Sequence, residues 1–293
     1  MEAAARAALA DAGLRPGRLL GAGMEGVVLE LDDDTVVKVW HHRPPAELER
    51  LRAFTDALAV PGLATPRVER VLTLGSRTAT LERRLPGRPL VAGEGGAVEA
   101  VVAVLAALRE APVSPALRSL PLLPDESPLP TATSFEHGLA DLVLRRAPGP
   151  LATAVPDLDH VVARVVDRLR SRPPAPPRLL HGDLIPANVH VDEAGRPVAV
   201  LDFGFLTTTG DPAFDAAVAA SIQDMYGAGA RATEAAADVA IRERLGDDPA
   251  DLALFRAVYA LVTATCFSAS GSDGHFAWCV ALLLREDVRG ALA

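Results

Sequence analysis

The feature that most constrains the fold of this 293-residue chain is a pair of short polar motifs in its second half. The first, HGDLIPANV, has the pattern H-x-D-x-x-x-x-N, and the second, LDFG, follows it closely. The six residues that the motifs specify are His181, Asp183, Asn188, Asp202, Phe203 and Gly204. At about 5% usage each, six residues at fixed separations match by chance in on the order of one in 10⁵ such chains. The pattern is therefore not an accident of composition.

The residue types in these motifs are typical of a metal site next to an acid–base group. Asn188 and Asp202 stand at the two ends of a predicted hairpin with its turn at 192–195, so we expect them to converge on one point. Amide and carboxylate oxygens are ligands suited to Mg²⁺. Asp183 has no metal role in this scheme and is expected to accept or orient the proton of an attacking hydroxyl. We expect His181 to hold the loop by hydrogen bonding rather than to act as a base.

A glycine-rich segment near the N-terminus indicates a site for phosphate groups. GAGMEGVV places Gly21, Gly23, Gly26 and Val28 in the pattern G-x-G-x-x-G-x-V. Glycine lets the backbone approach phosphates where a side chain would collide. Three glycines in this spacing arise by chance in roughly one chain in ten, so a glycine-containing hairpin without a ligand is the alternative.

Lys38 lies in the middle of the apolar segment VVKVW, one predicted strand after the glycines. A buried lysine needs a negative partner, which predicts contacts with phosphates and with a glutamate on the following helix. Glu47 and Glu49 are the candidates, and Glu47 fits better because Leu51 and Phe54 then take neighbouring core-facing positions. The alternative is an edge-strand lysine that points to solvent.

The order of predicted elements indicates an α+β fold, with a small β-rich lobe at 1–84 and a larger, mainly helical lobe at 85–293. Residues 18–40 are predicted to form strands around a polar turn at 32–34, and AELERLRAFTDALA then has the spacing of a helix. The longest apolar run, 257–269, is too short to cross a membrane and predicts a buried core helix.

Composition and charge exclude several classes of protein. The net charge is −9 and the isoelectric point about 5.3, so nucleic acid is not an expected partner. The N-terminal segment MEAAARAALADAG lacks a basic region followed by an apolar core, so we expect neither a signal peptide nor a membrane partner. The two cysteines, Cys266 and Cys279, fit neither a disulfide framework nor a zinc pattern, which favours a reducing, cytoplasmic location.

These residues resemble the protein-kinase-like superfamily, and within it the aminoglycoside phosphotransferase (choline-kinase-like) family. The resemblance runs from Gly21 to about Asp215, and GDPAFDAA is similar to the G-D-P-x-x-D-L-A signature of the small-molecule family. Gly182 and Ile185 stand where protein kinases usually have Arg and Lys. Only FLTTT separates Gly204 from GDP, so neither a long activation loop nor a peptide-docking platform is expected.

The resemblance implies a bilobal protein-kinase-like fold that uses Mg²⁺. It implies Asp183 as the catalytic residue, with Asn188 and Asp202 as metal ligands. Asp211 and Asp215 would have structural roles, the first as a helix cap and the second as an anchor for the backbone of the catalytic loop.

The same resemblance implies a binding site for ATP or GTP in the first lobe. The glycine-rich segment, Lys38 and Glu47 would meet the phosphates. A linker near 81–85 would bind the adenine edge through its backbone. The linker residues concerned are Glu82, Arg83 and Arg84.

We therefore expect an ATP-dependent phosphotransferase that moves the γ-phosphate to a hydroxyl of a small molecule, with aminoglycosides, other antibiotics and metabolites as candidates. A non-catalytic nucleotide-binding module and a protein kinase are the alternatives. The substrate pocket is expected from 91–178 and from the helices after Asp211. Acidic residues there would suit an aminated substrate, although solvated surface charges are the simpler explanation. They are Asp125, Glu126, Glu136, Asp141, Asp224 and Asp273, accompanied by the aromatic residues Tyr226 and Trp278.

Overall fold

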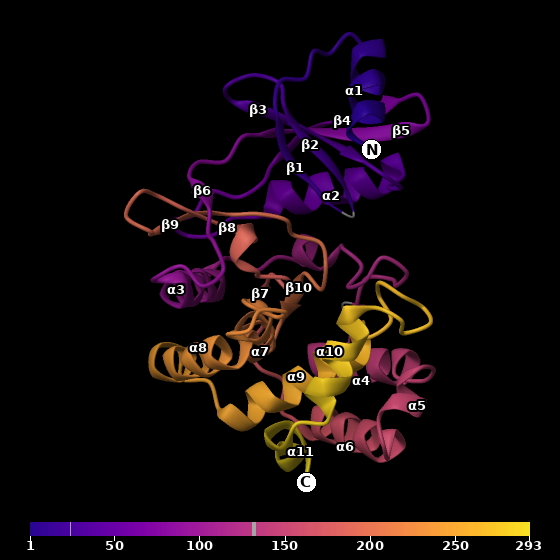
Figure 1. Ribbon diagram of the computed structural model, residues 1–293, viewed down its shortest axis with the longest axis vertical. Coiled ribbons are helices and arrows are strands. Elements are labelled where there is room, and N and C mark those ends of the chain that lie inside the picture. Colours follow the sequence, from indigo (N-terminus) through magenta and orange to yellow (C-terminus); the bar gives the residue numbers. More distant parts are fainter. Residues whose placement is uncertain (24, 131–132) are drawn as a thin grey trace.

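The structure, a computed structural model, describes residues 1–23, 25–130 and 133–293. Figure 1 shows an antiparallel β-sheet with two helices at one end of the molecule and a larger, mainly helical lobe at the other. No helix in the described part of the chain is long and apolar enough to cross a membrane.

The sheet of the first lobe has five antiparallel strands in the order β1-β2-β3-β5-β4. As expected, the chain turns between the second and third strands at the acidic segment 31–34. The strands are β1 (Leu19–Ala22), β2 (Gly26–Glu30), β3 (Thr35–Trp40), β4 (Val68–Leu74) and β5 (Arg77–Arg83).

The two faces of this sheet carry different chemistry, because successive side chains of a strand point to opposite faces. One face is apolar and packs against α1 (Glu2–Asp11), through Leu9 on the helix and Val37 and Val39 on β3. Lys38 lies between these two valines in sequence and therefore on the opposite face, where it is paired in register with Val28 on β2. That face looks toward the helical lobe (Figure 1).

Helix α2 (Pro45–Ala57) lies between the sheet and the helical lobe (Figure 1). It begins as expected after Pro44, with Pro45 in its first turn, where a missing N–H costs nothing. Its buried residues include Leu48, Leu51 and Phe54, which join the main hydrophobic core. The helix thus connects the two lobes by apolar packing.

Two buried helices form the centre of the larger lobe. Every residue of α7 from Ala213 to Ile222 and every residue of α9 from Leu252 to Thr263 is buried. The other helices surround this pair (Figure 1). The helices are α3 (Ala97–Glu110), α4 (Phe135–Arg146), α5 (Leu151–Ala154), α6 (Leu158–Ser171), α7 (Pro212–Ile222), α8 (Ala230–Leu245), α9 (Pro249–Thr263), α10 (Gly274–Leu283) and α11 (Glu286–Leu292), with a short 3₁₀ helix, η1, at Pro115–Arg118.

The prediction of a helix at 257–269 is only partly correct. α9 begins earlier, at Pro249 after the capping residue Asp248, and ends at Thr263. The serines that follow bond to one another, with Ser268 Oγ 3.1 Å from Ser270 Oγ. Serine hydroxyls that bond locally compete with helical hydrogen bonds, so the apolar run ends in a turn.

Short strands at the lobe boundary hold the functional loops. β7 (Arg178–Leu180) pairs with β10 (Thr208–Gly210), and β6 (Arg88–Pro89), β8 (Val189–Val191) and β9 (Pro197–Val200) form a second small sheet. The β8–β9 hairpin is the one expected around the turn at 192–195. It is followed directly by the LDFG motif.

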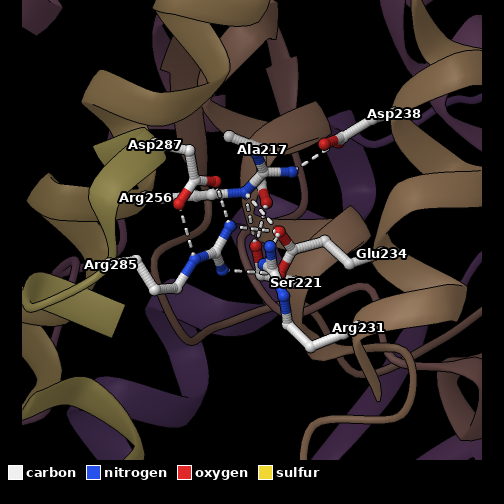
Figure 2. Close-up of polar contacts among 8 residues, drawn as sticks. All are labelled: Ala217, Ser221, Arg231, Glu234, Asp238, Arg256, Arg285 and Asp287. Atoms are coloured by element: carbon white, nitrogen blue, oxygen red, sulfur yellow. Dashed lines mark hydrogen bonds and ion pairs between the residues drawn. The ribbon is translucent and has the colours of Figure 1, made fainter. Parts of the chain in front are cut away.

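A charged cluster ties the C-terminal helices together (Figure 2). Glu234 on α8 is 5% exposed and lies 2.6 Å from Arg285 and 2.9 Å from Arg231. Arg256 on α9 is 3% exposed, donates to Ser221 on α7 at 2.9 Å and forms an ion pair with Asp238. Buried charges of this kind are costly unless each has its partners.

Replacing Glu234 by Gln should therefore lower the free energy of unfolding by about 3 kcal/mol, since it removes the carboxylate shared by buried Arg256 and half-buried Arg285. The control is Glu49→Gln, which breaks the exposed ion pair between Glu49 and Arg52 and should change stability by less than about 0.5 kcal/mol. Urea unfolding of the two variants at neutral pH measures the difference. Equal stability of both variants would contradict a structural role for the cluster.

Candidate active site

The loop that carries the first motif is fixed by a buried carboxylate. Asp215, in the first turn of α7, accepts hydrogen bonds from the backbone N–H groups of His181 at 2.9 Å and Gly182 at 2.8 Å. Thr207 donates from Oγ1 to the carbonyl of His181 at 2.7 Å and accepts from the N–H of Gly204 at 2.8 Å. The two motif loops are therefore held by side chains from the segment that follows them.

His181 is a structural residue of this loop, as expected. Its Nε2 lies 2.6 Å from the carbonyl oxygen of Leu201, and its Nδ1 accepts from the N–H of Asp183 at 3.2 Å. Both ring nitrogens are therefore engaged by the backbone. The ring packs on Phe203 at 4.5 Å between centroids, and Phe203 in turn lies 5.9 Å from Phe54 of α2. This row of rings joins the loop of His181 and Asp183 to helix α2 of the first lobe.

Asp183, Asn188 and Asp202 come together at the lobe boundary. Asn188 donates from Nδ2 to the backbone carbonyl of Asp183 at 2.8 Å, which leaves its side-chain oxygen available as an acceptor. Asp202 has a φ of 59°, a left-handed conformation that is uncommon for a residue with a side chain. Its Oδ1 lies 3.0 Å from Nζ of Lys38, so the second motif and the sheet of the first lobe meet here.

This donor set suits Mg²⁺ rather than a transition metal. The described residues contain no group of three or more His, Cys, Asp or Glu that could hold a metal ion by themselves. Mg²⁺ needs no such cage, because it is bound by one or two carboxylate or amide oxygens together with water and phosphate oxygens. Asp202, whose side chain is 49% exposed, and the free oxygen of Asn188 fit that requirement.

The carboxylates of this site differ in their readiness to ionise. Burial raises the pKa of Asp183 to about 6, and the nearby carboxylates of Asp202, Glu25 and Asp215 add to this, while His181 opposes it. For Asp202, which keeps part of its side chain in solvent, desolvation by the surrounding protein also disfavours ionisation, but the charge and hydrogen bond of Lys38 outweigh it and lower the pKa. Asp202 is therefore fixed as an anion, and Asp183 takes up a proton in the weakly acidic range.

Lys38 is paired differently from our expectation. Its Nζ lies 2.9 Å from Glu25 and 3.0 Å from Asp202, and among the described residues it has no ion pair with Glu47. Glu47 lies half-buried in the first turn of α2, whose core face is taken by apolar residues, and Glu49 pairs with Arg52. Glu25, which lies inside the glycine-rich segment, takes the position expected for Glu47.

The glycines of the first motif have two different roles. A Cβ on Gly26 would lie 2.4 Å from the carbonyl oxygen of Val39, so this glycine is needed for the close approach of β2 to β3. A Cβ on Gly21 or Gly23 would meet nothing within 4 Å, which leaves open space beside the backbone. Val28 lies on the Lys38 face of the sheet. Only the first two glycines are thus free to approach a ligand.

The linker residues are partly in the sheet. Glu82 and Arg83 belong to β5, and only Arg84 lies beyond it, with its N–H donating to the carbonyl of Asp34 at 2.7 Å. The side chain of Arg84 pairs with Glu30 at 3.0 Å. Glu82 accepts from Thr80 at 2.6 Å, and burial raises its pKa. The side chains of Glu82 and Arg84 are therefore bound within the first lobe.

Comparison with known proteins assigns the chain to a protein family. Residues 17–255 match the phosphotransferase enzyme family. The chain belongs to this family. No curated protein sequence matches it.

Solved structures give the same fold. Aminoglycoside phosphotransferase APH(4)-Ia is 16% identical, with 100% of this chain and 98% of that chain covered and a TM-score of 0.73. APH(3'')-Id from Streptomyces rimosus is 19% identical over 89% and 99% of the two chains, with a TM-score of 0.58. The macrolide 2'-phosphotransferase MphH from Brachybacterium faecium is 20% identical over 96% and 98%, with a TM-score of 0.58. These likenesses confirm the expected bilobal, kinase-like α+β fold, and the family match confirms the expected phosphotransferase class.

Three residues that surround Lys38 in the structure were not among those expected from the sequence. They are Glu25, Arg43 and Trp40. Arg43 lies 2.8 Å from Glu25, and the Trp40 ring is 4.0 Å from Nζ of Lys38. Trp40 is two residues after Lys38, so on a strand both side chains point to the same face of the sheet. This spacing alone could have placed Trp40 beside Lys38. Glu25 offered no such signal, since charged residues are common in loops.

The loop before Asp183 contains a glycine whose backbone conformation and close surroundings leave no room for a side chain. Gly182 has a φ of +83°, and a Cβ there would lie 2.5 Å from backbone atoms of Phe205 and Leu206. Gly182→Ala should therefore destabilise the protein by more than about 2 kcal/mol. Gly195, with a φ of +75° and nothing within 4 Å, is the matched control, and Gly195→Ala should cost about 1 kcal/mol. Thermal unfolding tests this, and equal losses would show that loop contacts do not matter.

Proposed function

We propose that this protein transfers the γ-phosphate of ATP to a hydroxyl of a small molecule. The observation that carries the proposal is the junction at the lobe boundary, where Asn188 is bonded to the loop of Asp183 and Lys38 contacts Asp202. Asp183 accepts the proton of the acceptor hydroxyl, and Lys38 binds phosphate oxygens. Asn188 and Asp202 would hold Mg²⁺, which would supply positive charge to offset that of the phosphates.

The relatives support ATP as the donor. A crystal structure of a thermostable mutant of APH(4)-Ia is a complex with AMP-PNP and hygromycin B, and that of APH(3'')-Id contains ADP and streptomycin. Three features of this chain suit such a nucleotide: a lysine on β3, open space beside Gly21 and Gly23, and the carboxylate of Asp202. The lowered pKa of Asp202 keeps this carboxylate ionised, as a metal ligand must be. Charge and space at this position thus suit a triphosphate.

The segment after the second motif favours a small acceptor over a protein. Thr207 is bonded to both motif loops, and β10 directly after it pairs with β7. Asp211 then caps α7 by accepting from the N–H of Ala213 at 2.9 Å. The chain from Gly204 to α7 is therefore short and fully tied to the lobe, and leaves no platform for a peptide.

The acidic residues considered for an aminated substrate are mostly engaged in structure. Asp125 pairs with Arg146, Glu126 with Arg145, and Asp141 with Arg170. Asp273 caps α10 through the N–H of Phe276, and Glu136 accepts from the N–H of Ala175. Carboxylates already neutralised by arginine attract a polycation weakly.

Aromatic residues, in contrast, gather between α9 and α10, within reach of the charge of Asp183. Tyr259 on α9 is buried, and burial together with the charge of Asp183 holds its pKa well above the usual range. Its ring lies 6.0 Å from Trp278, and His275 connects this pair to Phe267 at 4.8 Å. Phe267 is 46% exposed, so the cluster reaches the surface. These contacts favour an acceptor with an apolar face beside its hydroxyl.

The proposal is tested by ADP release from Mg-ATP across a panel of hydroxylated compounds, from macrolides and nucleosides to aminoglycosides and amino alcohols. We expect turnover with a member that has an apolar face. Asp183→Asn should lower that turnover roughly 10²–10⁴-fold, because it removes the proton acceptor. The variant should fold as well as wild type, since the ionised carboxylate is disfavoured there. Wild-type turnover in Asp183→Asn would exclude the proposed role, and ATP binding without turnover on any compound would favour a binding module.

The pH profile gives a second test of the same residue. The pKa of Asp183 is raised to about 6, so the carboxylate is protonated below that pH and cannot accept the substrate proton. We expect kcat/KM to fall about tenfold per pH unit below 6 and to be level above it. A profile that stays flat down to pH 4.5 would contradict Asp183 as the base.

A further inference from the structure

A glutamate of the glycine-rich segment binds two cations at once. Glu25 places Oε2 2.9 Å from Nζ of Lys38 and Oε1 2.8 Å from Nη2 of Arg43. Both cations also lie over the ring of Trp40, Lys38 at 4.0 Å and Arg43 at 4.7 Å from its centroid. Trp40 is itself fixed, because its indole N–H donates to Thr80 at 3.1 Å. The indole therefore holds the two positive charges side by side.

Arg43 also reaches the second motif. A Cβ on Gly204 would lie 3.6 Å from Nη2 of Arg43, and the charge of Arg43 contributes to the lowered pKa of Asp202. The backbone of Arg43 is fixed, because its carbonyl accepts from Thr78 at 2.6 Å. In the described part of the chain, Glu25 is the one carboxylate that pairs with its guanidinium. Arg43 thus stands beside Lys38 and over the proposed metal-binding loop.

The carboxylate of Glu25 therefore occupies the position between Lys38 and Arg43 in which the phosphate oxygens of a nucleotide would bind. The side chain of Glu25 is 40% exposed, whereas Lys38 and Arg43 are less exposed, so the carboxylate is the member of the cluster that solvent can take up when a ligand replaces it. A triphosphate carries more charge than one carboxylate and can bond both cations simultaneously, whereas Glu25 and phosphate oxygens repel each other.

Resting on the proposed function, we propose that Arg43 is a second phosphate-binding residue beside Lys38, and that Glu25 is an internal counter-ion that the nucleotide displaces from both. Before ATP binds, Glu25 keeps the two cations together on the Trp40 ring. When ATP binds, its phosphates take over Arg43 and Lys38, and the Glu25 side chain leaves both cations.

The opposite role is chemically conceivable and gives the opposite result. A glutamate can stay on the lysine in the nucleotide complex and orient it toward the phosphates. Neutralising that glutamate would then weaken ATP binding. The direction of change in affinity therefore separates a displaced counter-ion from a permanent partner.

The experiment is titration calorimetry of wild type, Glu25→Gln, Arg43→Gln and Arg43→Lys with Mg-ATP and with adenosine. Glu25→Gln should bind Mg-ATP about fivefold more tightly, because no carboxylate competes. Arg43→Gln should bind it about tenfold more weakly, and Arg43→Lys should recover part of that loss. Adenosine, which has no phosphate, should bind all four proteins equally.

The matched controls are Glu49→Gln and Arg52→Gln on α2, which separate another glutamate–arginine pair at 2.9 Å and should leave affinity for Mg-ATP unchanged. Weaker Mg-ATP binding by Glu25→Gln, or wild-type affinity in Arg43→Gln, would overturn the inference while ATP binding by wild type still supports the proposed function. Failure of wild type to bind Mg-ATP would overturn both.

Discussion

The carboxylate of Asp215 accepts the backbone N–H groups of His181 and Gly182, and at 2% exposure it is closed off from solvent. A buried carboxylate with its hydrogen bonds satisfied is costly to move, because any shift leaves an unpaired charge in an apolar surrounding. The loop between β7 and β8 is therefore fixed relative to α7, the buried centre of the larger lobe. This fixed loop carries Asp183 at the lobe boundary, and the backbone carbonyl of Asp183 accepts the side chain of Asn188.

The first lobe is coupled to that loop by two contacts of different kinds. One is apolar, the row of rings from Phe54 through Phe203 to His181. The other is ionic, the pair of Lys38 and Asp202. Apolar packing involves no charges that a ligand could take up, whereas a partly exposed ion pair is exchangeable. The lobes are thus joined by apolar packing, while the charges between them remain available to a ligand.

Much of this could be predicted from the sequence, and the reasons are local. The motif residues, the β8–β9 hairpin and the capping role of Asp211 follow from short-range patterns with well-defined chemistry. The anchoring role of Asp215 joins residues 33 and 34 positions apart and was expected only from the resemblance to the family. The partner of Lys38 could not be predicted, because a glutamate in a loop and one on a helix are equivalent until the chain is folded. The end of α9 was predicted wrongly because two local signals disagreed. The apolar content of the segment favoured a helix, while the serine hydroxyls favoured a turn.

The measurement that most directly tests the central claim is the Mg²⁺ dependence of ATP affinity, since it needs no acceptor. We expect wild type to bind ATP more tightly with Mg²⁺ than with EDTA, because Asn188 and Asp202 bind the metal together with the phosphates. Asn188→Ala should lose this increase and keep the metal-free affinity. Equal ATP affinity of wild type with and without Mg²⁺, or an unchanged increase in Asn188→Ala, would contradict the proposed phosphotransfer site.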